Sequence, residues 1–366
     1  MRETRTVRLA TRGSDLALRQ AAAVAERLED RRTEVELVEV ETEGDRIRDE
    51  LIHRLGKTGA FVRALDERVL EGEVDAAVHS MKDVPTDFPE DLVVAGVPER
   101  APAGDLLLTP GGRTLEELPE GATVGTSSLR RQAQLLAERP DLDVRPLRGN
   151  VDTRVEKLFA TSVGEEHERR VTAAEEDDPD ETFEESTDEW FDSLSEIERQ
   201  ALSRYPVDTA YDAIVLAEAG LERMGLLDHV PHQRFEPTRF VPAPGQGAVA
   251  VTALSDAAEP LREALDHPRT RVETTVERTV LEELGGGCVA PLGVHATLRG
   301  EYVHAVARVL GRDGEESIRD TRDLPARDYA EAAREFAADL ADRGAAELVA
   351  AARKTAAEHE ETEGPR

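Results

Sequence analysis

The chain has very little cysteine, lysine and continuous apolar sequence. One cysteine among 366 residues excludes an internal disulfide and a metal site made of several thiolates, so Cys288 is either an inert core thiol or a reactive one. No run approaches the roughly 20 apolar residues that span a bilayer, and the chain start leads into a short strand rather than a signal-peptide core. We therefore expect a cytoplasmic protein with no membrane partner.

Acidic residues dominate the charge. The chain holds 46 basic and 78 acidic residues, and this net charge of −32 argues against a nucleic-acid partner. Only four lysines are present, which leaves arginine as nearly the only cation. Self-repulsion of this size is screened by salt, which points to a salt-adapted organism. An ordinary acidic protein with an arginine-rich codon bias is the alternative.

Short β-branched runs alternate with longer helical patterns, which is typical of an α/β fold. A first group contains strand Val7–Thr11, helix Ser14–Asp30, and strands Glu34–Val40, Val74–His79 and Leu92–Val97. A second group contains strands Leu106–Thr109 and Ala122–Thr126, a helix from about Ser128 to Glu138, and strands Val144–Leu147 and Tyr211–Ala217. Both Ala10–Leu16 and Val124–Leu129 pass from strand into helix, so we predict two related lobes that face a shared cleft.

The remaining segments complete the predicted domains. The proline-rich Phe240–Pro244 carries the chain back to the first lobe, where Gly247–Leu254 adds a strand. A third unit is predicted from helix Arg271–Leu284, the glycine loop with Cys288, strands Val294–Leu298 and Val303–Val309, and a helix from about Asp328. We expect a first lobe at 1–100 plus about 245–264, a second at about 101–240, and a smaller α+β domain at about 268–366.

An acidic insertion interrupts the second lobe at about 161–205. Between Thr161 and Gln200 there are sixteen acidic residues and three arginines, with little hydrophobic periodicity. This composition predicts a solvated, partly disordered surface segment in which Trp190, Phe191 and Leu194 dock a short helix. A functional acidic tail is the alternative.

Arginines gather near two junctions where a strand passes into a helix, Thr11–Ser14 and Gly125–Ser128. The free amides at a helix start bind anions, and serine or threonine hydroxyls add donors, although ordinary N-capping explains Ser14 or Ser128 alone. The nearby arginines are Arg12, Arg130, Arg131, Arg148 and Arg154. Arginine binds carboxylates through a planar fork, so the cluster at strand ends predicts a polycarboxylate ligand, with surface ion pairs as the alternative.

The segment His79–Pro85 follows a buried strand and holds a base, a hydroxyl, a cation and a carboxylate.

Six motifs in order resemble those of the porphobilinogen deaminase (hydroxymethylbilane synthase) family and cover nearly the whole chain apart from the insertion. They are Ala10–Ser14, Val78–Pro85, Val124–Gln132, Leu147–Val151, Pro244–Ala248 and Gly286–Cys288.

The resemblance implies a fold, an activity and a cofactor. The fold is two α/β lobes like those of periplasmic binding proteins around a cleft, plus the smaller C-terminal domain. The family joins four porphobilinogen molecules head to tail on a dipyrromethane primer, releases ammonia, and hydrolyses the product hydroxymethylbilane from the enzyme. It also implies a cytoplasmic monomer that acts in tetrapyrrole biosynthesis, with no metal.

The resemblance also implies roles for particular residues. Cys288 would hold the primer by a thioether, and Asp83 would be the catalytic carboxylate. Catalysis would also use Arg12, Arg148 and Arg154; cofactor binding would use Ser80, Lys82, Asp83, Thr126, Ser127, Ser128, Arg130 and Arg131; substrate binding would use Arg12, Ser14, Arg148, Arg154 and Gln246. In the lid motif Gly56–Phe61 the lysine, Lys57, stands one place earlier than in the family, and Val289 and Ala290 replace a more usual polar and branched pair.

Two rival interpretations belong to other classes. A non-catalytic two-lobe protein that binds an organic polycarboxylate shares the architecture, but it does not need Cys288 in a glycine loop or Asp83 beside Lys82. A thiol enzyme that uses Cys288 as its nucleophile needs a base within reach, and the sequence offers no local pairing for His295 or His304.

Overall fold

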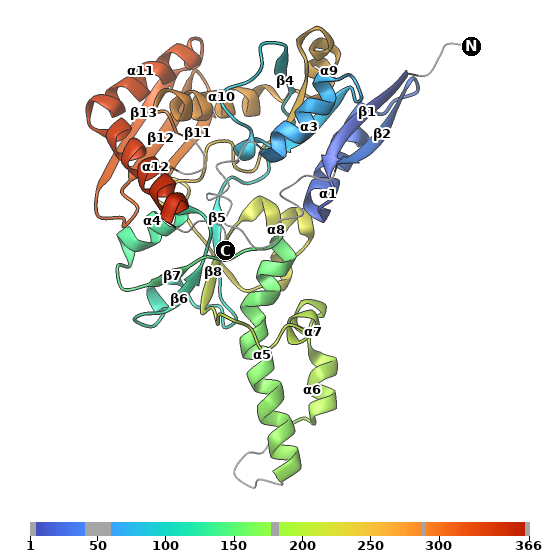
Figure 1. Cartoon of the computed structure of the whole chain (residues 1–366), viewed down its shortest axis with the longest axis vertical. Helices are drawn as coiled ribbons and strands as arrows, with labels where there is room; N and C mark the ends of the chain where they lie inside the picture. The colour runs from blue at the N-terminus through green and yellow to red at the C-terminus, as the bar shows by residue number, and fades with distance from the viewer. Residues whose placement is uncertain (1–4, 41–59, 177–182, 287–289, 363–366) are drawn as a thin grey trace.

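The computed structural model describes residues 5–40, 60–176, 183–286 and 290–362 of the chain. Two five-stranded sheets and one three-stranded sheet form its framework (Figure 1). No helix in these ranges combines the length and the apolar character that a bilayer crossing requires.

The first sheet has the strand order β2-β1-β3-β10-β4. Its strands are β1 (Arg5–Arg12), β2 (Thr33–Val40), β3 (Ala76–Ser80), β4 (Leu92–Gly96) and β10 (Val249–Leu254), and its helices are α1 (Asp15–Leu28), α3 (Ala60–Leu70) and α9 (Ala258–Leu265). β1 runs parallel to β2 and β3, whereas β10 runs antiparallel to β3 and β4. The predicted return of the chain to the first sheet through Gly247–Leu254 is confirmed.

The second sheet repeats this plan with the order β7-β6-β8-β5-β9. Its strands are β5 (Asp105–Leu108), β6 (Thr123–Gly125), β7 (Asp143–Arg145), β8 (Ala213–Ala217) and β9 (His232–Arg234), and its helices include α4 (Leu129–Glu138) and α8 (Glu218–Met224). β6 is parallel to β7 and β8, and β5 is antiparallel to β8 and β9. β6 therefore corresponds to β1, and β5 to β10, which confirms the two related lobes.

Two segments connect the lobes, residues 97–104 between β4 and β5 and residues 235–248 between β9 and β10. Each of these hinge segments leads into or away from the antiparallel strand of a sheet. The chain therefore crosses between the lobes twice, and the antiparallel strand of the first lobe comes from beyond the second.

The C-terminal unit is an antiparallel sheet, β11-β12-β13, covered by helices. Its elements are α10 (Pro268–Glu283), β11 (Leu292–Arg299), β12 (Tyr302–Leu310), β13 (Ser317–Pro325), α11 (Tyr329–Asp342) and α12 (Ala345–Thr362). Val276 of α10, Val294 of β11 and Phe336 of α11 pack in its core, all fully buried. α10 begins with Pro268 after His267, whose ring nitrogen caps the helix by accepting from the Thr270 amide.

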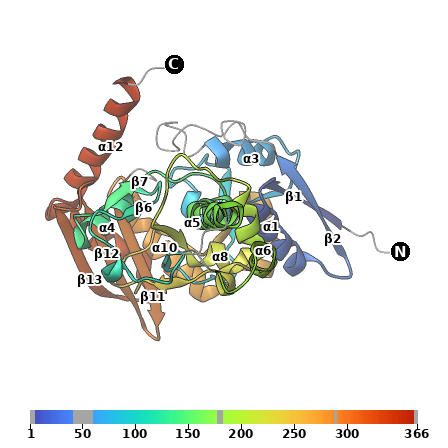
Figure 2. The same cartoon turned by 90° about the horizontal axis from the view of Figure 1, so that it is seen from below.

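The acidic insertion is more ordered than the sequence predicts. α5 (Val151–Glu176) runs without interruption past Thr161, and it is followed by α6 (Thr187–Ser193) and α7 (Glu196–Leu202). Figure 1 shows α5 projecting from the second lobe with α6 and α7 beside it, and Figure 2 shows the same helix end-on. The expected disorder is therefore wrong for the described residues. The predicted docking is confirmed for Trp190, which is buried, and for Leu194, which packs against the same core cluster, but it is wrong for Phe191, which is 40% exposed.

Candidate active site

The predicted first-lobe site residues stand at the carboxyl ends of two neighbouring parallel strands. Arg12 is the last residue of β1 and Ser80 the last residue of β3. Lys82 and Asp83 follow in the 3₁₀ turn η2 (Met81–Asp83). Ligands of open α/β sheets bind outside these strand ends, so the expected position of the site agrees with the fold.

Asp83 is exposed on a turn whose neighbours are firmly buried. Met81 and Val84 are 2% and 3% exposed, and the Val84 amide closes the turn by donating to the Met81 carbonyl at 3.2 Å. The Met81 amide donates to the Ala248 carbonyl at 3.0 Å, which ties the turn to the segment before β10. The carboxylate of Asp83 is thus presented to solvent from a fixed backbone.

The corresponding turn of the second lobe lies between β6 and α4. The Ser128 hydroxyl caps α4 by accepting from the Arg131 amide at 3.4 Å. The Ser127 hydroxyl donates to the Leu147 carbonyl at 2.6 Å, which joins this turn to the loop before α5. Thr126 is buried, and its hydroxyl accepts from the Ser128 amide at 3.2 Å.

Arg148 and Arg154 belong to the loop and first turn that open α5. The Arg154 Nε donates to the Gly149 carbonyl at 2.7 Å, and the Lys157 ammonium donates to the Arg148 carbonyl at 3.1 Å. Gly149 has φ +114°, and a Cβ there would lie 2.6 Å from a methyl carbon of Thr153. This loop conformation therefore requires glycine.

Cations of the two lobes act on one another across the site. Asp83 raises the pKa of Lys82, but burial and the charges of Arg131 and Arg154 outweigh it, so the pKa of Lys82 lies below its usual value. Burial and Arg131 lower the pKa of Arg154 to about 10, against the opposing charge of Asp83. Lys82, Asp83, Arg131 and Arg154 are therefore brought together, and the site is short of negative charge.

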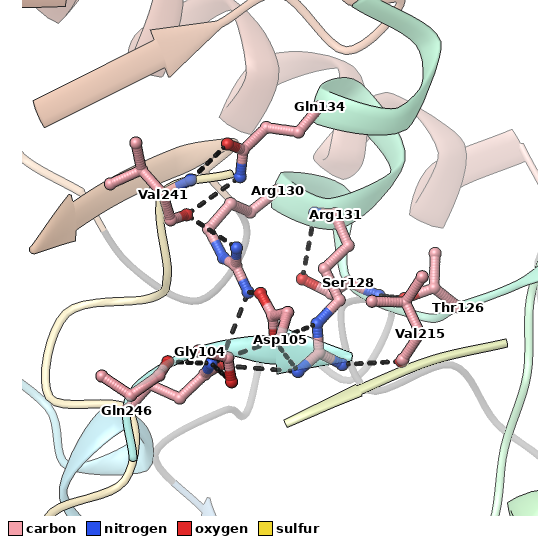
Figure 3. Close-up of polar contacts among 11 residues, drawn as sticks. Gly104, Asp105, Thr126, Ser128, Arg130, Arg131, Gln134, Val215, Val241 and Gln246 are labelled. Carbon is pink, nitrogen blue, oxygen red and sulfur yellow. Dashed lines mark hydrogen bonds and ion pairs between the residues drawn. The ribbon is translucent and has the colours of Figure 1, made fainter. Parts of the chain in front are cut away.

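Arg130 and Arg131 share one buried carboxylate, that of Asp105 (Figure 3). The Arg130 Nη2 donates to Oδ2 of Asp105 at 2.7 Å, and the Arg131 Nη2 donates to Oδ1 at 2.7 Å. Burial raises the pKa of Asp105, but the two guanidinium groups lower it by a larger amount, so the net pKa lies below the usual range. Two positive charges against one negative charge leave this corner of the site cationic.

Gln246 is 1% exposed and lies in the second hinge segment. Its amide nitrogen donates to the Ala103 carbonyl at 2.6 Å and to Oδ1 of Asp105 at 3.0 Å. Figure 3 shows it beneath the two arginines. These contacts give Gln246 a place in the hinge, and the expected contact with substrate stays a prediction.

Two predicted residues, Cys288 and Lys57, lie outside the described residues. Ser14 precedes α1 without a side-chain capping bond, and it is half-buried. Sequence reasoning missed Asp105, which opens the fully buried strand β5. An acidic residue directly before Leu106–Leu108 is the signal that could have identified it, because a carboxylate at a buried position needs cationic partners.

Fold and site together define a two-lobed α/β protein with a cationic site between its lobes and a smaller third domain. The family model described as "Porphobilinogen deaminase, dipyromethane cofactor binding domain" matches residues 7–174 and 194–262. The model of the C-terminal domain of porphobilinogen deaminase matches residues 272–343. The chain belongs to the porphobilinogen deaminase family.

Relatives support this membership over nearly the whole chain. A probable porphobilinogen deaminase of Halobacterium salinarum is 55% identical and covers 96% of this chain and 99% of its own length. One of Methanococcoides burtonii is 40% identical, covering 93% and 95%. The porphobilinogen deaminase of Sulfurimonas denitrificans is 38% identical, covering 94% and 96%.

Solved structures give weaker likenesses. The ectoine-binding protein TeaA is 11% identical, with a TM-score of 0.32 over 98% of this chain and 84% of its own. An ABC transporter structure from Parabacteroides distasonis is 13% identical, with a TM-score of 0.33 over 94% of each chain. TM-scores this low do not support a fold assignment, and the two-lobed α/β fold is instead established by the sheets described above.

Family membership assigns the activity of a hydroxymethylbilane synthase, a transferase of tetrapyrrole biosynthesis, with a dipyrromethane cofactor. The rival interpretations as a non-catalytic binding protein and as a simple thiol enzyme are thereby set aside.

Proposed function

We propose that this enzyme condenses porphobilinogen stepwise at Asp83, with the primer attached to Cys288. The observation that carries the proposal is the exposed Asp83 carboxylate beside Lys82 and Arg154. Burial and neighbouring cations lower the pKa values of Lys82 and Arg154. Acetate and propionate groups on each pyrrole need such a surplus of positive charge. The same surplus would hold a carboxylate-bearing cofactor.

The described residues fit the cofactor chemically. Arg130 Nε is buried and has no hydrogen-bond partner within the described ranges, so it can donate to a carboxylate. The cofactor, once bound through Cys288, supplies the pyrrole carbon to which the first substrate is joined. Lys82, Thr126, Ser127, Ser128, Arg130 and Arg131 would hold it.

Asp83 would act on the substrate. Loss of ammonia from the aminomethyl group leaves positive charge on the adjoining carbon, and a carboxylate nearby stabilises that charge. The same carboxylate assists proton transfer to the leaving amine and from the pyrrole carbon after the new bond forms. Arg12, Ser14, Arg148 and Arg154 would orient the substrate carboxylates, because a guanidinium fork fixes both position and angle.

We propose the same domain boundaries, location and partners as the sequence predicts. The domains divide at the predicted boundaries, which the membership of each sheet supports. The enzyme works as a cytoplasmic monomer on a small molecule, with no membrane or nucleic acid as partner, and its net charge of −32 supports the last point.

Replacing Asp83 tests the catalytic assignment. Asp83→Asn and Asp83→Ala should lower turnover by at least ~100-fold, the usual scale for acid–base groups, because neither side chain carries a charge. Steady-state rates of hydroxymethylbilane formation measure the effect.

Intact-protein mass spectrometry of the same variants provides the control. A mass increase on Cys288 that equals two linked pyrrole units should persist in both. Near-normal turnover in both variants would contradict the role of Asp83, and an unmodified thiol in active wild-type protein would contradict the role of Cys288.

A further inference from the structure

Arg278, on α10 of the C-terminal unit, binds the backbone on both sides of Asp83. Its Nη1 donates to the Val84 carbonyl at 2.8 Å, and its Nη2 donates to the Pro85 carbonyl at 2.7 Å. Nη1 also lies 3.4 Å from the Met81 carbonyl oxygen. One guanidinium from another domain thus bridges the start and the end of the turn that presents the proposed catalytic carboxylate.

The chain directly after the turn needs such a donor. The 3₁₀ turn η2 ends at Asp83 and is closed by the Val84 amide, so the carbonyls of Val84 and Pro85 lie beyond the turn and have no partner within it. Pro85 cannot extend the turn, since it has no amide hydrogen. Arginine offers several donors in one rigid plane, whereas lysine offers a single ammonium on a flexible stem. The arrangement is therefore specific to a guanidinium.

Packing fixes the turn on one side only. Met81 and Val84 are buried in a core cluster of the first lobe. Between this segment and α10 there is instead a cavity of about 210 Å³, lined by Met81, Thr86 and Thr275 among others. A cavity contributes no contacts that hold a neighbouring group in place. On the α10 side, the position of the turn therefore depends on the hydrogen bonds from Arg278.

The helix that carries Arg278 is itself fixed by the preceding residue. Glu277 is fully buried, and its two oxygens accept from Nη1 and Nη2 of Arg100 at 2.8 and 2.9 Å. Oε2 also accepts from the Gly245 amide at 2.7 Å. Arg100 and Gly245 belong to the two hinge segments. α10 is thus tied to the hinge at one residue and to the Asp83 turn at the next.

We propose that Arg278 is a positioning residue for Asp83, which it holds at a fixed place relative to the hinge and the C-terminal domain. This inference rests on the proposed catalytic role of Asp83. Without the guanidinium of Arg278, the Asp83 turn can shift into the cavity, although every group that binds the substrate carboxylates is still present. We therefore expect loss of the Arg278 guanidinium to lower kcat more than it changes KM.

The test compares Arg278→Gln and Arg278→Lys with a matched control, Arg271→Gln. Arg271 lies two turns earlier on α10 and donates to the Val94 and Ala95 carbonyls of β4 at 3.1 and 3.2 Å. It also pairs with Asp266 at 2.6 Å, so it binds the backbone of a different segment and leaves the Asp83 turn untouched. A misplacement of about 1 Å can cost about 100-fold in rate, so we expect Arg278→Gln to lower kcat by about 10- to 100-fold, with KM within about twofold. Arg278→Lys should recover part of the loss, and Arg271→Gln should keep the wild-type kcat.

Hydrogen exchange of residues 81–87 supplies a readout that does not depend on turnover. It should quicken in Arg278→Gln and not in Arg271→Gln, while the mass increase on Cys288 remains. Wild-type kcat and exchange in folded Arg278→Gln would overturn the proposal, as would equal loss of kcat in both glutamine variants. If Arg278→Gln does not fold, Arg278→Lys decides: a lowered kcat at native melting temperature supports the inference, and wild-type values reject it.

The Asp83 variants separate this inference from the function on which it rests. If Asp83→Ala is inactive and Arg278→Gln is normal, only the positioning role fails. If Asp83→Ala is active, the catalytic assignment itself fails.

Discussion

At the scale of single residues, Glu277 shows how one carboxylate can join three parts of a molecule. It binds Arg100 of the first hinge segment, the Gly245 amide of the second, and the Ala296 amide of β11 at 2.9 Å. Burial raises its pKa, but Arg100 and the His295 ring, whose Nδ1 lies 3.6 Å from Oε1, lower it more, and the net pKa is about 2. The carboxylate therefore stays charged throughout the neutral range.

This pKa predicts how the stability of the protein depends on pH. A carboxyl group whose pKa is depressed on folding stabilises the protein above its unfolded pKa, and the stabilisation is lost as the pH falls toward the folded pKa. For Glu277 the window runs from its ordinary pKa of 4.5 down to about 2. Glu277→Gln leaves Arg100 without its buried counterion, which costs about 3–5 kcal/mol at pH 7.

We expect the difference in unfolding free energy between wild type and Glu277→Gln to shrink as the pH falls through that window. Denaturant unfolding at a series of pH values measures it. Glu273→Gln is the control, because Glu273 is a buried α10 carboxylate that accepts from the Leu298 amide of β11. A difference that is the same at every pH would show that the charge of Glu277 is not what stabilises the hinge.

At the scale of elements, helix α6 packs against the part of α5 that lies far from the site. The family model leaves residues 175–193 unmatched, and α6 falls in that gap. Arg170 of α5 lies 5.1 Å from the ring centre of Trp190 and 4.4 Å from that of Phe183. Arg154 and Arg170 are separated by about 24 Å along the helix axis at ~1.5 Å per residue. The cation and the two rings hold α6 on α5 far from the proposed catalytic groups.

Trp190→Ala should therefore loosen α6 without slowing catalysis. Removing a buried tryptophan costs about 3–5 kcal/mol, and here the loss should appear as faster hydrogen exchange in residues 187–202 rather than as global unfolding. Phe191→Ala is the matched control, since Phe191 is 40% exposed and its loss should cost under ~0.5 kcal/mol. Slower turnover in Trp190→Ala alone would indicate that this arm contributes to the site.

At the scale of the whole molecule, the net charge of −32 dominates. Self-repulsion on this scale weakens the compact state, and salt screens it: the Debye length falls from ~10 Å at 0.1 M to ~3 Å at 1 M. We expect the melting temperature to rise as KCl increases from about 0.1 to about 2 M, in keeping with a salt-adapted protein.

Sucrose at matched osmolality separates screening from general exclusion at the protein surface. Equal stabilisation by sucrose and KCl would argue against charge repulsion as the cause. Sedimentation equilibrium on the same samples checks the proposed monomer, because a dimer at high salt would attribute part of the stabilisation to association.

Much of this arrangement could be predicted from local sequence. Apolar runs identified strands such as β3 and β8, and ordered motifs identified the Asp83 turn and the Ser128 cap. The ordered insertion was missed, although its signals are local as well. Ser186 with Glu189 and Ser195 with Glu198 form capping boxes that begin α6 and α7. Their acidic context concealed them, since helical periodicity is weak where most positions face water.

The sequence by itself determined the lobes, the site motifs and the family, because strand and helix periodicity and turn chemistry depend on residues close together in the chain. Only the tertiary structure decided which charges meet. Asp105 pairs with Arg130 across 25 positions, and Arg278 reaches Val84 across 194. Such contacts depend on how two lobes and a third domain pack, and a buried charge leaves no periodic trace of its partner. The groups that hold Asp83 and the site arginines in position therefore became visible only in the folded chain.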